Sequence, residues 1–365
     1  MFDFFKEHKN IQRVINTKYE VIFYAENAYY YQYFRHLVED LSSKGIKICY
    51  ITSDKNDPLL QQQNNGMDVV FSKSTLAFLF NKLKAYVMVM TMPDLGQFIF
   101  KKSAGVKKYV YVFHALVSIH QQYRHGAFDN YDGIFCAGPH HHDEILESES
   151  FFTQKNKELV NYGYPLLNAL AEKQVTIKVS AKRILIAPSW YEQGILQTCI
   201  KKIIAILGPS EYEVLIRPHP EFIKRNKKAF EQMKKEIRLF PNISMDINPQ
   251  LWESMLWSNY LITDRSGIAF EFAFTKNRPV IFIETPLKIQ NTEVHRFQNI
   301  PVENRYRNMI GLIVPINKIN EIPDYLNQAD NKIAFYAEQI HEVKKKVLFE
   351  NSLQDGVQYI LDQIS

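Results

Sequence analysis

Two histidines follow apolar, strand-like runs of this chain and could carry a proton to or from a substrate. His114 comes directly after the run YVYVF, and His219 comes shortly after the run YEVLI. A base that takes a proton from an alcohol needs a pKa near neutrality, as histidine has. We therefore predict that His114 is a general base held at the edge of a sheet. The alternative is a structural histidine that hydrogen-bonds a neighbouring loop.

The second histidine belongs to the tetrapeptide Arg217-Pro218-His219-Pro220. The two prolines restrict the backbone and would hold both functional side chains in place. An arginine can fork onto phosphate oxygens while a histidine donates to a bridging or leaving oxygen. The pattern predicts a diphosphate site that contains Arg217 and His219. A proline-rich exit from a strand explains the same residues without function.

A polar turn lies inside the run LITDRSGIAFEFAFTKNRPVIFIETP, between an apolar segment and a helical one. Its residues are Asp264, Arg265, Ser266 and Gly267. A helix that follows directly on a strand presents free N–H groups and a positive dipole end at the carboxyl edge of the sheet, where a phosphate can bind. Ser266 could cap this helix or donate to a phosphate, and Gly267 would let a ligand approach closely. An ordinary capped turn is the alternative.

Three further groups of residues are weaker candidates. Ser189-Trp190 follows the strand-like run RILIAP, and its indole could stack on a base, although packing is the simpler role. His140, His141 and His142 are adjacent, which does not give one chelating face, so we expect a solvated helix start and no metal. The basic run 221–239 is expected to be one long helix with a solvated face.

The elements that position these residues alternate along the chain. Apolar runs of strand length are separated by helical segments, which predicts parallel sheets with helices on both faces. The pattern stops at a polar linker after residue 172 and restarts at residue 182. We predict two Rossmann-type doubly wound lobes that face a cleft, 1–172 and 182–330, and a helical tail over 331–365. The segment 195–207 is expected to be one helix. In such sheets ligands bind at the carboxyl ends of strands, where every candidate above lies.

Composition restricts the classes of partner and site that the protein can have. The chain has 365 residues, 46% of them hydrophobic, and a formal net charge of +5. That mild charge suits an anionic substrate or a membrane surface and does not indicate nucleic acid. The three cysteines are scattered and predict neither a zinc site nor a disulfide scaffold. We see no secretion signal or membrane-spanning run, and expect a cytoplasmic protein that is at most peripheral to a membrane.

Taken in order, the motifs FHALVSIH, NYGYP, ILIAPSW, LIRPHP and LITDRSGIAFEFAFTKNRPVIFI resemble the CDP-glycerol glycerophosphotransferase family. The resemblance covers roughly residues 105 to 285 and implies a GT-B-like fold. It implies that His114 and His219 are the two essential histidines and that Asp264 and Ser266 belong to the donor site. The motif NYGYP adds Tyr164 to the substrate-binding candidates.

The chain departs from the family pattern at two positions. Ala115 and Leu116 replace a Gly-Thr pair after His114, and Gly267 replaces a second serine. The first change concerns the acceptor side and the second the choice of donor.

The predicted function is transfer of glycerol phosphate, or another polyol phosphate, from a CDP-activated donor to a hydroxyl of a glycan or lipid-linked acceptor. No acidic cluster predicts a protein-bound metal, while Mg²⁺ bound to the donor phosphates remains compatible with the chemistry. Two other enzymes fit the same motifs: a GT-B glycosyltransferase that uses a nucleotide sugar, and a sugar-nucleotide epimerase. A non-catalytic nucleotide- or polymer-binding subunit of a capsule assembly complex is the alternative from another class.

Overall fold

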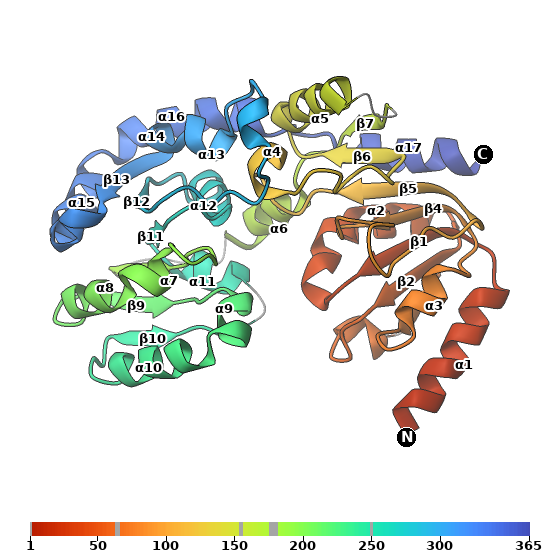
Figure 1. Cartoon of the computed structure of the whole chain (residues 1–365), viewed down its shortest axis with the longest axis horizontal. Helices are drawn as coiled ribbons and strands as arrows, with labels where there is room; N and C mark the ends of the chain where they lie inside the picture. The colour runs from red at the N-terminus through yellow and green to blue at the C-terminus, as the bar shows by residue number, and fades with distance from the viewer. Residues whose placement is uncertain (1, 63–65, 153–155, 175–181, 249–250) are drawn as a thin grey trace. The chain divides into compact units, whose positions relative to one another are not determined.

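The structure is a computed structural model, and it describes residues 2–62, 66–152, 156–174, 182–248 and 251–365. The chain divides into two compact units (Figure 1). The first comprises Met1–Leu166 and Val347–Ser365, and the second comprises Leu167–Lys346. Most of the predicted linker lies outside the described residues.

The first unit is built on a seven-stranded parallel sheet with the order β3-β2-β1-β4-β5-β6-β7. Its central strands are continuous apolar runs, such as VIF in β1, because helices cover both faces of the sheet. The strands are β1 Tyr19–Ala25, β2 Ile48–Thr52, β3 Met67–Phe71, β4 Ala85–Met90, β5 Val106–Val112, β6 Gly133–Cys136 and β7 Glu158–Asn161. The helices are α1 Phe2–Asn16, α2 Tyr31–Ser43, α3 Leu76–Phe80, α4 Ile119–Gln122, α5 Pro139–Phe152, α6 Pro165–Gln174 and α17 Leu353–Ile364, with short 3-10 turns at Ala28–Tyr30 and Pro58–Leu60.

The second unit repeats this plan with six parallel strands in the order β10-β9-β8-β11-β12-β13. The strands are β8 Arg183–Ile186, β9 Glu213–Ile216, β10 Ile243–Met245, β11 Tyr260–Thr263, β12 Val280–Glu284 and β13 Gly311–Pro315. The helices are α7 Ile195–Thr198, α8 Ile200–Leu207, α9 Pro220–Arg225, α10 Lys227–Ile237, α11 Leu251–Trp257, α12 Ile268–Lys276, α13 Val302–Arg305, α14 Arg307–Ile310, α15 Ile322–Asn331 and α16 Ile333–Val347, with 3-10 turns at Val294–Arg296 and Ile316–Glu321. Both sheets have the strand order of a Rossmann-type fold, as predicted.

The last helix of the chain returns to the first unit. Helix α17 (Figure 1) contacts α2 and β7. The Tyr359 hydroxyl on this helix is hydrogen-bonded to Glu158. The segment before it passes close to two glycines. A Cβ on Gly138 would lie 1.9 Å from the carbonyl oxygen of Val347, and Gly163 has a φ of +76° against Phe349. These glycines therefore make room for the returning backbone.

Two helices predicted as continuous are broken. The segment 195–207 is interrupted at Cys199, whose φ is −142°, and the basic run 221–239 is interrupted at Asn226, whose φ is −113° and ψ 46°. The side-chain oxygen of Asn226 accepts a hydrogen bond from the Trp190 indole at 3.3 Å. A tertiary contact therefore holds Asn226 outside the helical conformation, and the expectation of one long helix is wrong.

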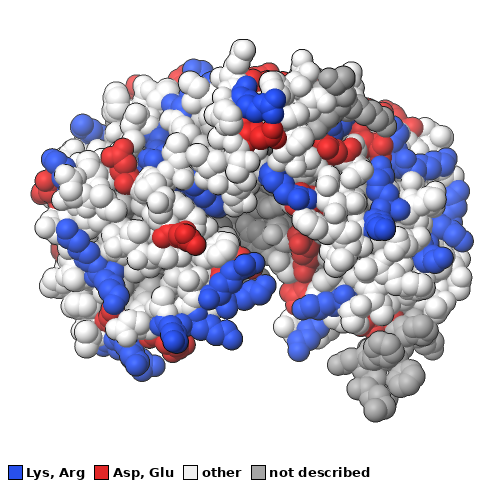
Figure 2. All heavy atoms as spheres, viewed as in Figure 1, with Lys and Arg blue, Asp and Glu red and all other residues white. Residues whose placement is uncertain are grey.

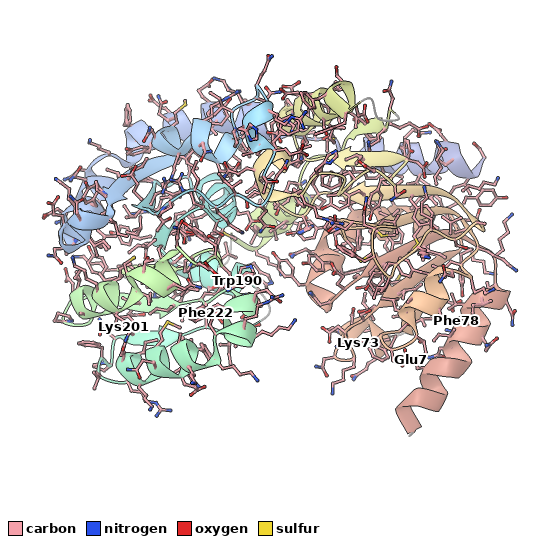
Figure 3. All side chains as sticks on the ribbon, viewed as in Figure 1. Glu7, Lys73, Phe78, Trp190, Lys201 and Phe222 are labelled. Atoms are coloured by element: carbon pink, nitrogen blue, oxygen red, sulfur yellow. The ribbon has the colours of Figure 1, made fainter. Side chains whose placement is uncertain are left out.

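The first helix is attached to its own unit. The Glu7 carboxylate accepts hydrogen bonds from the Thr75 hydroxyl at 2.7 Å and from the Lys73 amide at 3.0 Å (Figure 3). Ile11 and Val14 are buried on the same helix. These contacts pack α1 on the first unit.

The surface carries mixed charge. On the face shown in Figure 2, Lys and Arg are interspersed with Asp and Glu in both units. Within the described ranges, no helix is both long and apolar enough to cross a membrane.

Candidate active site

Asp264, at the carboxyl end of β11, organises the second unit's site. Its side chain is fully buried. One carboxylate oxygen accepts hydrogen bonds from the Ser189 amide and hydroxyl, both at 2.8 Å, and from the Arg265 amide at 2.7 Å. The other oxygen accepts from the Ile195 amide at 3.2 Å. Asp264 therefore joins the loop after β8 and the start of α7 to the turn after β11.

The turn ends at the start of helix α12. Gly267 is the N-cap, and Ser266 makes no capping hydrogen bond, so of its two predicted roles the capping role is wrong. In the part of the chain that the structure describes, the amide N–H groups of Ser266, Gly267 and Ile268 have no protein acceptor. These amides, together with the positive end of the helix dipole, are suited to an anion.

Gly267 has φ −61° and ψ −22°, an ordinary right-handed helical conformation. Its backbone does not require glycine. What the residue supplies is the absence of a side chain beside the free amides.

Arg265 extends from this turn toward the loop after β12. Its Nη1 donates to the Asn304 side-chain oxygen at 3.2 Å, and its Nη2 donates to the Thr285 carbonyl at 3.0 Å. Its Nε is buried, and no described residue accepts from it. Burial lowers the pKa of the Arg265 guanidinium.

Arg307, the first residue of α14, lies in the same region and is only 4% exposed. Its Nη2 donates to the Ile283 carbonyl at 3.0 Å and to the Asp264 carbonyl at 3.4 Å. Its buried Nε also finds no acceptor among the described residues. Burial, and then the charge of Arg265, lower the pKa of Arg307 to about 10.

His219 is the N-cap of helix α9, and its Nδ1 accepts a hydrogen bond from the Glu221 amide at 3.2 Å. The proton of the neutral ring is therefore on Nε2, which can donate to a ligand. Loss of solvent around the ring, and then the charge of Lys288, lower the pKa of His219. The imidazole is thus a neutral hydrogen-bond donor at pH 7.

Other predicted donor residues already have protein partners. Arg217 forms an ion pair with Asp246, with 2.5 Å between Nη1 and the carboxylate. Ser189 donates to Asp264 through both its amide and its hydroxyl. The Trp190 indole donates to Asn226, and the Arg225 guanidinium of α9 is 5.1 Å from its ring. In this structure these three residues shape the loops, and their contact with a donor stays a prediction.

The first unit holds His114 among tyrosines just after β5. The ring centroids of Tyr30 and Tyr33 lie 5.1 and 6.2 Å from that of His114. The Tyr111 hydroxyl lies 3.5 Å from Nδ1, and the Tyr164 hydroxyl donates to the His114 carbonyl at 2.9 Å. Burial lowers the pKa of His114 to about 4, against a smaller opposing effect of a hydrogen bond to the Thr91 backbone. The imidazole is therefore unprotonated at pH 7, as a general base must be.

The three adjacent histidines of α5 differ from expectation. His140 and His141 are buried, so the prediction of a solvated helix start is wrong. His141 accepts from the Ala137 amide, lies 3.1 Å from the Val117 carbonyl through Nε2, and stacks on Phe113. These contacts make His141 a packing residue. The described residues contain no group of three His, Cys, Asp or Glu side chains that could hold a metal ion.

The structure thus groups the candidates by unit. Asp264, Arg265, Ser266 and Gly267 meet the Ser189 loop and lie near His219 at one edge of the second sheet, while His114 and Tyr164 belong to the first unit. Sequence reasoning missed Lys288, which follows β12 and could have been found by the same strand-end rule. It also missed Arg307, for which no local pattern exists.

The comparisons with known proteins agree with this architecture. The model of the family described as CDP-Glycerol:Poly(glycerophosphate) glycerophosphotransferase matches residues 7–356. No curated protein matches the sequence.

Several solved structures have a similar fold. The wall teichoic acid polymerase TagF aligns with a TM-score of 0.62 at 14% identity, over 98% of this chain and 92% of that one. MnaA of S. aureus, in a structure with UDP, aligns with a TM-score of 0.60 at 12% identity, over 94% of this chain and 97% of that one. A UDP-GlcNAc 2-epimerase of Neisseria meningitidis aligns with a TM-score of 0.59 at 13% identity, over 95% and 100%. At these identities the similarity shows the fold alone, and it confirms the predicted GT-B-like class.

Proposed function

We propose, because this chain belongs to the CDP-glycerol:poly(glycerophosphate) glycerophosphotransferase family, that it transfers glycerol phosphate or a related polyol phosphate from a CDP-activated donor to an acceptor hydroxyl. The acceptor would be a glycan or a lipid-linked chain in a teichoic acid-like or capsule polymer. The observation that carries this proposal is the family match over residues 7–356. The free amides at the start of α12, beside a neutral histidine that can donate from Nε2, support a diphosphate donor.

In the proposed reaction, His114 accepts the proton of the acceptor hydroxyl. The hydroxyl oxygen then attacks the phosphorus that bears the polyol, and the bond from that phosphorus to the bridging oxygen breaks. The electron pair leaves with CMP, and His219 stabilises the leaving phosphate by donating a hydrogen bond from Nε2. The neutral state of His219 favours hydrogen bonding over full proton transfer. Positioning and charge stabilisation supply most of the rate enhancement in such chemistry.

The residues around the donor have separate roles in this proposal. Ser266, Gly267 and Ile268 bind phosphate oxygens through their amides, and Asp264 holds the turn in place without touching the donor. Tyr164 positions His114 through its carbonyl. Mg²⁺ bound to the donor phosphates would add to the charge stabilisation. A lipid-linked acceptor would place the enzyme on the cytoplasmic side of a membrane, in peripheral contact.

The test is turnover by the purified chain. The protein is incubated with an acceptor and with CDP-glycerol, CDP-ribitol or a panel of nucleotide sugars, and CMP or UDP release is followed by mass spectrometry with Mg²⁺ or with a chelator. We expect CMP release from a CDP-polyol and addition of polyol phosphate to the acceptor. Turnover of a nucleotide sugar alone would replace the proposal with a glycosyltransferase or an epimerase. Nucleotide affinity without turnover of any donor would indicate a binding subunit.

A further inference from the structure

The second unit contains two guanidinium groups, the buried one of Arg307 and the half-buried one of Arg265, that have no carboxylate partner among the described residues. Arg265 and Arg307 donate only to carbonyl and amide oxygens, and the buried Nε of each has no acceptor among the described residues. The carboxylates of Glu284, Asp264 and Glu303 act on Arg265 through their charge, and the buried one of Asp264 accepts four hydrogen bonds from other groups. Asp264 is therefore not the counterion of either arginine.

A third cation lies in the same place. Lys288 follows strand β12, and no hydrogen bond or ion pair fixes its ammonium group in the described structure. It lies close enough to His219 and to Asp264 for their charges to influence one another. Burial lowers the pKa of Lys288, with smaller opposing effects of Asp264 and Glu303.

Buried charges are normally paired, because an uncompensated charge removed from water costs several kcal/mol. Three cations that share one site and lack an ion pair are compensated when an anion binds between them. The free amides of α12 begin at the residue after Arg265, and the charge of Arg265 acts on Arg307, so the amides and both guanidinium groups belong to the same part of the second unit. A diphosphate carries more negative charge than a single phosphate and therefore compensates three cations more fully.

We propose that Arg307 and Lys288, together with Arg265, bind the diphosphate of a nucleoside diphosphate-linked donor. This inference rests on the proposed function and adds two residues that the sequence motifs do not contain. Both belong to the segment between β12 and β13, so that segment and the turn after β11 hold the diphosphate jointly. Arg307 also fixes the Asp264 and Ile283 carbonyls, which links anion binding to the geometry of the turn.

The experiment measures binding of CDP and of inorganic pyrophosphate to the full chain by calorimetry. The variants are Arg307→Gln and Lys288→Gln. The matched control is Arg278→Gln, because Arg278 belongs to the same unit and its guanidinium is already paired with Asp330 at 2.7 Å. Since a hydrogen bond to a charged group contributes about 1.5–3 kcal/mol, we expect roughly 10- to 100-fold weaker binding of both ligands to Arg307→Gln. Lys288→Gln should bind both ligands more weakly as well, and the control should bind like the wild type.

The outcomes separate this inference from the proposed function. Unchanged pyrophosphate affinity in Arg307→Gln and Lys288→Gln would overturn the inference, even if the wild type releases CMP from CDP-glycerol. Weaker pyrophosphate binding in the variants supports the anion site even if CDP-glycerol is not turned over. If Arg307→Gln does not fold, Lys288→Gln decides, because the Lys288 ammonium makes no hydrogen bond to the described residues.

Discussion

The two units share a strand order but differ in the charge of the groups at their candidate sites. In the first unit, His114 lies among tyrosine rings, and burial keeps its imidazole neutral. In the second unit, Arg265, Arg307 and Lys288 belong to the turn after β11 and to the segment between β12 and β13, and no described residue forms an ion pair with them. The two sheets therefore have the same strand order, but the first unit presents a neutral imidazole and the second unit presents cations.

This difference suggests which unit binds the acceptor and which binds the donor. A neutral, aromatic site suits a sugar or polyol hydroxyl, whose proton must be removed. The three cations and the free amides of the second unit suit a diphosphate, whose negative charge must be offset. Changes in one unit should then alter chemistry, and changes in the other should alter donor binding or the local fold.

The largest expected effect is that of His114→Ala. Loss of a general base should lower kcat for CMP release by about 10²- to 10⁴-fold, because base catalysis typically contributes that much. Binding of CDP, which we assign to the second unit, should stay within a factor of about two. Steady-state kinetics and calorimetry measure the two quantities, and His36→Ala serves as a surface control. If His114→Ala weakened CDP binding and left kcat unchanged, the division between the units would be wrong.

The next effect concerns the stability of the second unit. Asp264→Ala leaves the donors of Ser189, Arg265 and Ile195 without their acceptor, and we expect it to reduce the free energy of unfolding by about 3–5 kcal/mol. Urea unfolding gives the free energy, and amide hydrogen exchange shows where protection is lost. The loss should fall on the loops after β8 and β11. Glu231→Ala, at a surface ion pair with Lys234, should cost no more than about 1 kcal/mol.

The smallest expected effect, counted per histidine, is a loss of stability of the first unit in acid. His114 and His141 have pKa values lowered to about 4 and about 3 by burial. Between these values and about 6.5 the unfolded chain binds more protons than the native one, so stability falls as the pH falls through that window. Each such histidine should cost about 2 kcal/mol at pH 5 relative to pH 7.5.

Urea unfolding at the two pH values, combined with hydrogen exchange, tests this prediction. Protection should be lost first around β5 and α5. Equal loss across both units would show that the buried histidines do not dominate acid unfolding.

Local pattern was sufficient for most of the fold. The apolar run before His114 and the run before Asp264 are strands, as predicted, because a strand covered on both faces must be apolar throughout. The continuity of helices was harder to predict. Asn226 is outside the helical conformation and accepts a hydrogen bond from Trp190, which is 36 residues away. The helical character of α17 could be predicted from its amphipathic pattern, but its contacts with α2 and β7 could not.

The candidate site divides in the same way. The positions of His114, His219 and the turn at residues 264–267 after strands could be read from the amino-acid sequence, since strand ends and turns depend on neighbouring residues. The hydrogen bond from Ser189 to Asp264, 75 residues away, became known only from the folded chain, as did the proximity of Arg307 to Arg265, whose guanidinium groups form no ion pair with a described residue. Pairing of charges depends on distances between strands and loops remote in the chain, and no local pattern records those distances.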